Sequence, residues 1–186
     1  MKQKDSHSAP VPRPSFTVWT LHWVSALLVL FLLATSLESG LGFTKRLLPA
    51  MWMDWHLSAG VVLLVVTAIR MKSSRPWNGL TRIFLGRGWD VQAIKPFLLF
   101  VLILVLLSGL VIFQKPPIGR AGILFGLFPM PTMVRLDHSF HSWVIDLHIA
   151  LSFAAAFLVI AHAAWGLRRS AVLGRSRIAV MLWPWR

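Results

Sequence analysis

The stretch that decides the fold is Asp146–Arg169, DLHIALSFAAAFLVIAHAAWGLRR, an apolar segment that contains two histidines. An α-helix advances about 100° and about 1.5 Å per residue. The fourteen residues from His148 to His162 therefore bring both imidazoles to within about 40° of one face and separate them by about 21 Å. They are too far apart to share one metal ion. If each is a ligand, each needs a partner on another helix, and His22 and His56 are the suitable candidates.

The composition indicates a membrane protein. The chain has 186 residues, of which 56% are hydrophobic and 13% are charged, and it has no cysteine. Soluble domains average roughly 45–50% apolar and about 25% charged residues. Without cysteine, disulfides, iron–sulfur clusters and thiolate-ligated haem are excluded. Any metal or haem must be held by histidine, methionine or carboxylate side chains.

The net charge of +13 is typical of nucleic-acid-binding proteins when the protein is soluble. In a membrane protein, cationic loops gather on one side and set the topology. We favour this second interpretation and expect no nucleic-acid partner.

Four apolar segments are each long enough to cross a hydrocarbon layer of about 30 Å. The first is too long for a signal-peptide core and lacks a clear small-x-small cleavage site, so we expect it to be retained. The third carries no histidine, and Ser108 and Gly109 near its far end are small enough to permit close helix approach. The long connection Gln114–Ser142 has room for a short amphipathic helix. The expected helices are Phe16–Leu37, Trp52–Ile69, Pro96–Phe113 and Trp143–Leu167.

The distribution of lysine and arginine predicts the orientation. Fourteen of them lie in the N-terminal tail, the second connection and the C-terminal tail, and five lie in the other two connections. The side richer in basic residues faces the cytoplasm, so both termini should be cytoplasmic. The expected fold class is an all-α membrane protein with a four-transmembrane-helix bundle. Residues 16–169 would form the bundle, with a flexible tail over 1–15 and a basic tail over 170–186.

The helical rise gives the depth of each histidine. Measured from the cytoplasmic end of the apolar runs, His162 and His22 lie about 9 Å and about 10 Å deep. By the same measure His56 and His148 lie about 21 Å and about 30 Å deep. The histidines therefore form an inner pair, His22 with His162, and an outer pair, His56 with His148. Each pair joins two different helices.

Four histidines at two levels in hydrocarbon are not expected by chance, because ionisable side chains there are costly and are usually functional or paired. Two haems, each held by two imidazoles, account for all four, since a haem fills a gap between helices and takes one nitrogen from each ring. The second nitrogen then needs an acceptor, either a carbonyl one turn back or a hydroxyl.

Packing, zinc binding and proton relay stay open as alternatives to haem ligation. A single histidine in such a helix is more often a packing or hydrogen-bonding residue than a ligand. Zinc would lack its tetrahedral ligand set at a two-histidine site. A proton relay would favour Asp or Glu within the spans.

The remaining histidines and the methionines are weaker candidates for a ligand or binding role. His138 and His141 precede the fourth span and line a quinone or partner surface, ligate an adventitious metal, or are simple interfacial residues, which we favour. His7 lies in the N-terminal tail and is expected to be solvated. Thioether ligation is conceivable for methionines in the connections, but packing is favoured for them: Met51, Met53, Met130 and Met133.

The ordered motifs of the chain resemble those of the bacterial cytochrome b561 family, which are four-helix membrane cytochromes with two b-type haems. The resemblance runs from Thr17 to Arg169. Its features are LHW around His22, HLSAG from His56 to Gly60, FGLFPMP in an outer connection, and the two histidines fourteen residues apart. The third span departs from the family, because relatives often carry a histidine near its start.

The resemblance implies two haem b cofactors with His22, His56, His148 and His162 as axial ligands. It also implies a multi-pass protein of the bacterial inner membrane that exchanges electrons with quinone. Some family members react with superoxide at the outer face. Related cytochrome subunits instead serve as quinone-reducing anchors of hydrogenases or formate dehydrogenases.

Two further kinds of residue are candidates for contact with haem. Gly60, four residues after His56, either lets a macrocycle approach the backbone or permits close helix packing. Arg70 is the first candidate partner for a haem propionate. Topology accounts for the other basic candidates equally well: Arg168, Arg169, Lys45, Arg46 and Arg135.

Three functions remain open. Whether the protein is also an enzyme, acting as a quinone oxidoreductase, is left undecided. The first is electron transfer between quinone and a donor or acceptor at the membrane surface. The second is a haem-bearing anchor that relays electrons for a separate oxidoreductase or a periplasmic cytochrome. The third is a haem-free transporter or scaffold.

Superoxide as a substrate would require a cationic funnel on the outer side. That side carries five basic residues against four acidic ones, whereas the inner side carries fourteen against two. A strong outer funnel is therefore not predicted, although Arg120 and Arg135 could form a local cluster. Superoxide as a substrate is therefore implied only by the family resemblance.

Overall fold

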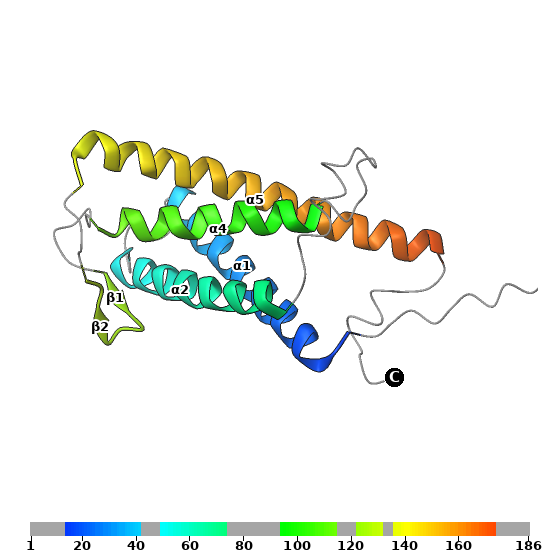
Figure 1. Ribbon diagram of the computed structural model, residues 1–186. Helices are drawn as coiled ribbons and strands as arrows, with labels where there is room; N and C mark the ends of the chain where they lie inside the picture. The colour runs from blue at the N-terminus through cyan, green and yellow to red at the C-terminus, as the bar shows by residue number, and fades with distance from the viewer. Residues whose placement is uncertain (1–13, 42–48, 74–93, 115–121, 132–135, 174–186) are drawn as a thin grey trace, which may run out of the picture.

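The computed structural model describes residues 14–41, 49–73, 94–114, 122–131 and 136–173. This part of the chain is helical apart from one short hairpin of two strands (Figure 1). Each helix is long and apolar enough to cross a membrane, so the expectation of four such helices is confirmed. The elements are α1 (Phe16–Leu41), α2 (Pro49–Ser73), α4 (Ile94–Ile112), β1 (Ile123–Leu124), β2 (Phe128–Pro129) and α5 (His138–Leu173).

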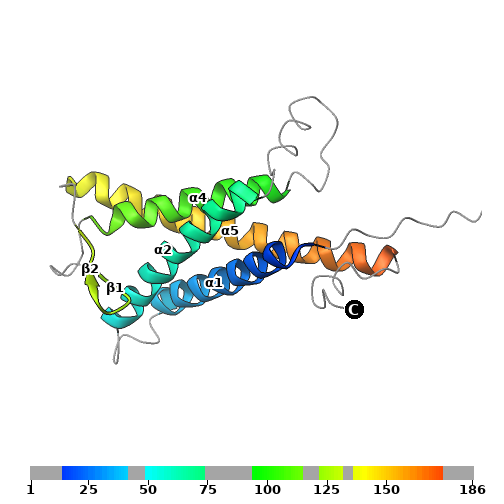
Figure 2. The same ribbon diagram turned by 60° about the horizontal axis from the view of Figure 1, so that its bottom comes forward.

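The helices alternate in direction along the chain. Helix α1 packs against α2, α2 against α4, and α4 against α5 (Figures 1 and 2). The starts of α1 and α4 and the ends of α2 and α5 lie together at one end of the bundle, which we call the basic end because Arg70, Lys72, Lys95 and Arg168 are there. The opposite end carries the β-hairpin and is called the hairpin end.

The helix bounds agree with the expected spans to within six residues, and most helices are longer than the apolar run. Capping residues are present at the starts of α1 and α5, and the cap of α5 accounts for its earlier start. Ser15 caps α1, since its side-chain oxygen accepts from the N–H of Val18 at 3.4 Å. Asp137 caps α5, since its Oδ2 accepts from the N–H of Ser139 at 3.0 Å. Hydropathy marks the membrane part of a helix, whereas polar caps mark its ends.

The described part of the connection before α5 is a hairpin, not an amphipathic helix, so that expectation is wrong over residues 122–131. Phe125 and Gly126 both have positive φ, 55° and 70°, which is the geometry of a type I′ turn. The N–H of Leu127 closes the turn by donating to the carbonyl of Leu124 at 3.0 Å. The chain therefore reverses here within two residues.

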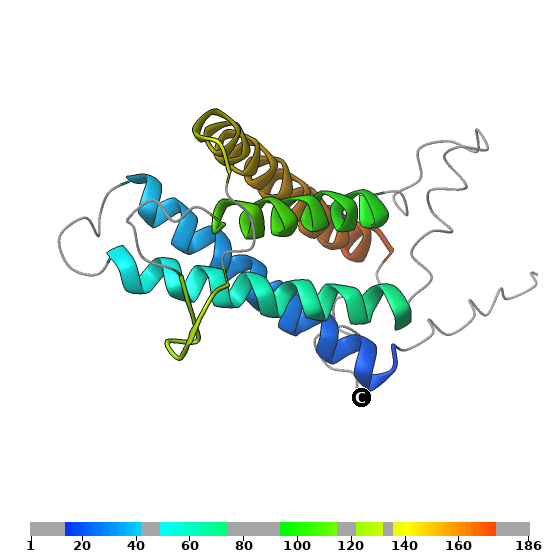
Figure 3. The ribbon, with the colours of Figure 1, turned by 60° about the vertical axis from the view of Figure 1, so that its left-hand side comes forward.

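The hairpin is fixed to α2 by two hydrogen bonds from its backbone. The N–H of Ile123 donates to Oδ1 of Asp54 at 3.0 Å, and the N–H of Phe125 donates to the hydroxyl of Ser58 at 2.8 Å. Figure 3 shows the hairpin beside α2. Its tip is apolar and exposed, with Leu127 74% accessible.

Much of the apolar surface of the bundle faces outward. Phe153, Phe157 and Ile160 are spaced to share one face of α5, and each is about two thirds exposed or more. The buried side chains are few and include Leu63, Val101, Leu106 and Ala155. An apolar exterior around a small core suggests contact with a lipid bilayer.

Candidate functional site

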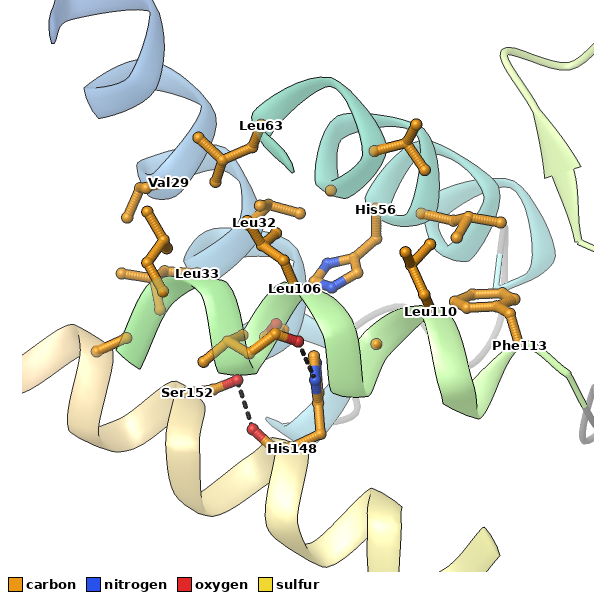
Figure 4. A pocket seen from close by; sticks show the side chains of 18 residues that line it. Val29, Leu32, Leu33, His56, Leu63, Leu106, Leu110, Phe113, His148 and Ser152 are labelled. Carbon is orange, nitrogen blue, oxygen red and sulfur yellow. Dashed lines mark hydrogen bonds between the residues drawn. The ribbon is translucent and has the colours of Figure 1, made fainter. Parts of the chain in front are cut away.

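The structure places His56 of α2 next to His148 of α5 near the hairpin end. The ring centroids are 6.5 Å apart and the ring planes are inclined by 74°. Figure 4 shows the two rings reaching toward one another past α4. Two metal–imidazole bonds of about 2 Å, and about 1 Å from each nitrogen to its ring centre, would separate the centroids by about 6 Å. The spacing thus suits one metal atom between the rings.

His56 is held by a hydroxyl on another helix. Its Nδ1 lies 2.8 Å from Oγ1 of Thr35 on α1. The Thr35 hydroxyl donates its own hydrogen to backbone carbonyls of α1, those of Phe31 and Leu32, at 3.0 Å. It is therefore the acceptor toward His56, which places the imidazole proton on Nδ1 and the lone pair on Nε2.

His148 is held in the same manner by α4. Its Nδ1 lies 3.0 Å from the hydroxyl of Ser108 and 3.0 Å from the carbonyl of Val105. A carbonyl only accepts, so Nδ1 carries the proton here too. Within the described residues neither Nε2 has a hydrogen-bond partner. This is the arrangement that metal-binding histidines usually adopt.

The expected acceptor for each ring is a carbonyl one turn back or a hydroxyl. Hydroxyls are present for both rings, but all of the acceptors come from neighbouring helices. Sequence reasoning did not identify Thr35 or Ser108 as partners. The available signal was a hydroxyl within an apolar span, and both side chains are buried.

A cavity of about 60 Å³ is bordered by both histidines and is lined mainly by leucine and valine from four helices. Gly109 borders it, and a Cβ there would lie 3.1 Å from Cε1 of His148. Gly60 also borders it, but a Cβ there would find only Leu106, at 4.0 Å. The close backbone approach is therefore at Gly109, while at Gly60 the structure has space for a methyl group.

The second pair lies toward the basic end. His22 of α1 is within Coulombic range of His162 of α5, and both histidines are within range of Arg70 and Lys95. Charged side chains of α2 and α4 thus act electrostatically on histidines of α1 and α5. Neither imidazole has a hydrogen-bond partner among the described residues. Helices α1 and α5 are not among the closely packed pairs in this part of the chain.

His138 and His141 lie in the first turn of α5, not in a connection ahead of the helix. His141 is 6% exposed, and its Nε2 donates to the carbonyl of Ile112 at 3.1 Å. It thus joins the end of α4 to the start of α5 and is not an open surface residue. His138 is exposed.

The other predicted residues either have different surroundings or lie outside the described part of the chain. Met51 and Met53 are exposed at the start of α2. Arg168 lies over the ring of Trp165, at 5.7 Å from its centroid. Arg169 is within α5, but its side chain is not described. Six of the predicted residues lie outside the described ranges: His7, Lys45, Arg46, Arg120, Met133 and Arg135.

Among the described residues, no group of three or more His, Asp or Glu side chains is arranged to hold a metal ion. Each histidine pair offers two imidazoles. In comparisons with known proteins, no family model, no curated protein and no solved structure matches the chain.

Proposed function

We propose that the protein is a membrane-spanning b-type cytochrome with two haems, which transfers electrons between the quinone pool and a donor or acceptor at the membrane surface. The observation that carries this proposal is the pair His56 and His148. Each ring has its Nδ1 hydrogen-bonded to a neighbouring helix, its Nε2 without a partner among the described residues, and the other ring at a two-ligand spacing.

The chemistry of the donor set fits haem. A haem supplies four ligands of its own and needs only two from the protein, and it carries single electrons when bound. His56 and His148 would hold one, and His22 and His162 the other. The cavity of about 60 Å³ is smaller than a porphyrin, so its lining would have to move apart when one binds.

The residues around the rings have separate tasks. Thr35 and Ser108 orient the imidazoles and keep the proton on Nδ1, so that the Nε2 lone pair is available. The leucine and valine lining excludes water. Arg70, near His22 and His162, is suited to pair with a propionate through a charge-assisted bond.

The proposed setting is the bacterial inner membrane, crossed by four helices with the basic end and both termini in the cytoplasm. The uneven distribution of lysine and arginine supports this orientation. The outward stripe of Phe153, Phe157 and Ile160 would contact acyl chains. Reaction with superoxide has no support beyond the family resemblance.

A second candidate function is a haem-bearing anchor that relays electrons for a separate oxidoreductase or periplasmic cytochrome. The hairpin favours it, because its apolar tip is exposed and its backbone is hydrogen-bonded to α2 at the end where such a partner would dock. Rapid reduction of the isolated protein by a quinol analogue would favour the first candidate, whereas copurification of a soluble redox partner would favour the second.

The test is a pyridine haemochrome assay on the purified full-length chain. We expect two b haems per chain, one after His148→Ala or after His22→Ala, and none after both. The matched control is His138→Ala, which removes an exposed histidine from the same helix as His148 and should leave two. Full haem content in both ligand variants, or a colourless protein after reconstitution with haem, would refute the proposal.

A further inference from the structure

The hairpin between α4 and α5 has no charged or polar side chain. Its sequence over residues 122–131 is GILFGLFPMP. The side chains of Phe125, Leu127 and Phe128 at its tip are all exposed. Connections that face water are usually built from polar residues together with Gly and Pro. A hairpin that exposes only apolar side chains is therefore suited to an apolar environment.

The bonds between the hairpin and α2 give its depth along that helix. The part of α2 that is apolar enough to cross a membrane begins at Met51. The hairpin is bonded to Asp54 and Ser58, which lie about 5 Å and about 10 Å past Met51 along the helix axis. Figures 1 and 3 show the hairpin projecting sideways from α2, not beyond the end of the bundle. The tip therefore lies beside the apolar span.

Exposed tryptophans mark the same level. Trp55 follows the first anchoring residue of α2 directly, and Trp143 lies near the start of α5 at the same end of the bundle. Both are about half exposed. Tryptophan gathers where acyl chains meet lipid headgroups, because its ring is apolar and its N–H is polar. The hairpin is thus attached to α2 at the level of the headgroup–acyl boundary.

The backbone of the hairpin is compatible with a poorly hydrated environment. An N–H without an acceptor is costly in lipid. Two N–H groups of the hairpin donate to side chains of α2. Those of Leu127 and Met130 donate to carbonyls within the hairpin, at 3.0 Å and 2.8 Å. Pro129 has no N–H to satisfy.

We propose that the hairpin is an interfacial anchor, whose tip of Phe125, Leu127 and Phe128 inserts into lipid at the headgroup–acyl boundary beside α2. The partner is the phospholipid of the membrane that the bundle crosses, and the contact continues the apolar exterior of the helices. The bonds to α2 are two residues before and two residues after His56, so the anchor also fixes the depth of that imidazole. The inference requires a bilayer but no haem.

The test uses the absence of cysteine, which allows a single nitroxide label to be placed on the full-length chain. Labelled Leu127→Cys is purified and reconstituted in vesicles of phosphatidylethanolamine and phosphatidylglycerol. EPR power saturation then compares collisions of the label with oxygen, which concentrates among acyl chains, and with a water-soluble nickel chelate. We expect oxygen to dominate at position 127, as at the helix-face control Phe153→Cys. Nickel should dominate at Ser139→Cys, an exposed position in the first turn of α5.

A second pair of variants tests whether the apolar side chains cause the insertion. With the label on Phe128→Cys, Leu127→Asp should reduce the inserted population by at least about tenfold, because the transfer free energy of leucine is lost. The ratio of oxygen to nickel collisions should fall accordingly. The matched control is Leu127→Met, which keeps an apolar side chain of similar size and should leave the ratio unchanged. Leu127 is exposed, so neither change disturbs packing inside the bundle.

Dominance of nickel at position 127 in these vesicles would overturn the inference, because the tip would then face water, where a soluble redox partner could dock. A label shielded from both reagents would also overturn it, since protein would then cover the tip. Either result, with oxygen dominant at position 153, would leave the proposed function standing. Dominance of nickel at position 153 as well would show that the bundle is not embedded in lipid, and would overturn both.

Discussion

Gly109 of α4 lies so close to the imidazole of His148 that a Cβ on Gly109 would be 3.1 Å from Cε1 of that ring. The neighbouring residue Ser108 and the carbonyl of Val105 hold the same ring through Nδ1. One turn of α4 thus both orients the imidazole and makes room for it. Neither helix can move away from the other without losing these bonds.

Gly109→Ala should therefore weaken the hairpin-end site. The added methyl group must push the ring by a few tenths of an ångström against two hydrogen bonds, which misdirects Nε2. We expect a loss of haem from this site, with total content falling from two toward one per chain in the pyridine haemochrome assay. Gly166→Ala is the control, because a Cβ there meets nothing within 4 Å. Equal haem content in the two variants would contradict the argument.

The cap of α5 gives a prediction about pH. The backbone N–H of Ser139, and next that of Phe140, holds the pKa of the Asp137 carboxyl below its ordinary value. A depressed pKa in the folded state means that the carboxylate adds stability above the ordinary pKa of about 3.9, and that this contribution is lost as the pH falls through the folded-state pKa. Asp137→Ala should lower Tm at pH 7, and the difference from the wild type should shrink below about pH 3.9.

Thermal unfolding in detergent at a series of pH values measures this effect. Asp137→Asn is the control, since asparagine caps a helix about as well as aspartate without titrating. It should keep most of the wild-type Tm at pH 7. A Tm difference between Asp137→Ala and the wild type that stays constant from pH 7 to pH 3 would show that the carboxylate is not the source.

The sequence was sufficient for the four helices, because hydropathy is a local property. It also paired His56 with His148, whose rings are neighbours in the structure. It did not reveal which face of each helix meets its neighbour, since these helices are apolar around their whole circumference. For that reason Thr35 and Ser108 were not identified as partners of His56 and His148. Close approach was expected at Ser108 and Gly109 as well as at Gly60, and the structure shows it at Gly109 but leaves space at Gly60.

The hairpin was missed for a different reason. Two-residue turns of this type usually contain Asn-Gly or Asp-Gly, but here the pair is Phe125-Gly126. The strands are two residues long and have no polar alternation. Their partners, Asp54 and Ser58, are almost seventy residues away in the chain.

Ser58→Ala should loosen the hairpin from α2. Ser58 is 2% exposed, and its hydroxyl accepts from the N–H of Phe125, which would lose its partner at a cost of about 1 kcal/mol. Hydrogen exchange at the Phe125 amide should become about fivefold faster, as that free energy implies. Ser25→Ala is the control, because the buried Ser25 hydroxyl bonds only to its own helix among the described residues. Unchanged exchange at Phe125 would show that Asp54 alone holds the hairpin.

Gly60→Ala distinguishes the two roles considered for that glycine. Without haem, a Cβ at position 60 is in ordinary contact with Leu106, so the haem-free variant should unfold at the wild-type Tm. If a macrocycle fills the cavity that Gly60 borders, the methyl group will collide with it and weaken binding. Saturating haem at about 100 times its Kd stabilises a protein by about 2.7 kcal/mol. The rise in Tm on haem addition should therefore be smaller in Gly60→Ala than in the wild type. Equal rises, with a lower haem-free Tm in the variant, would instead assign Gly60 to helix packing.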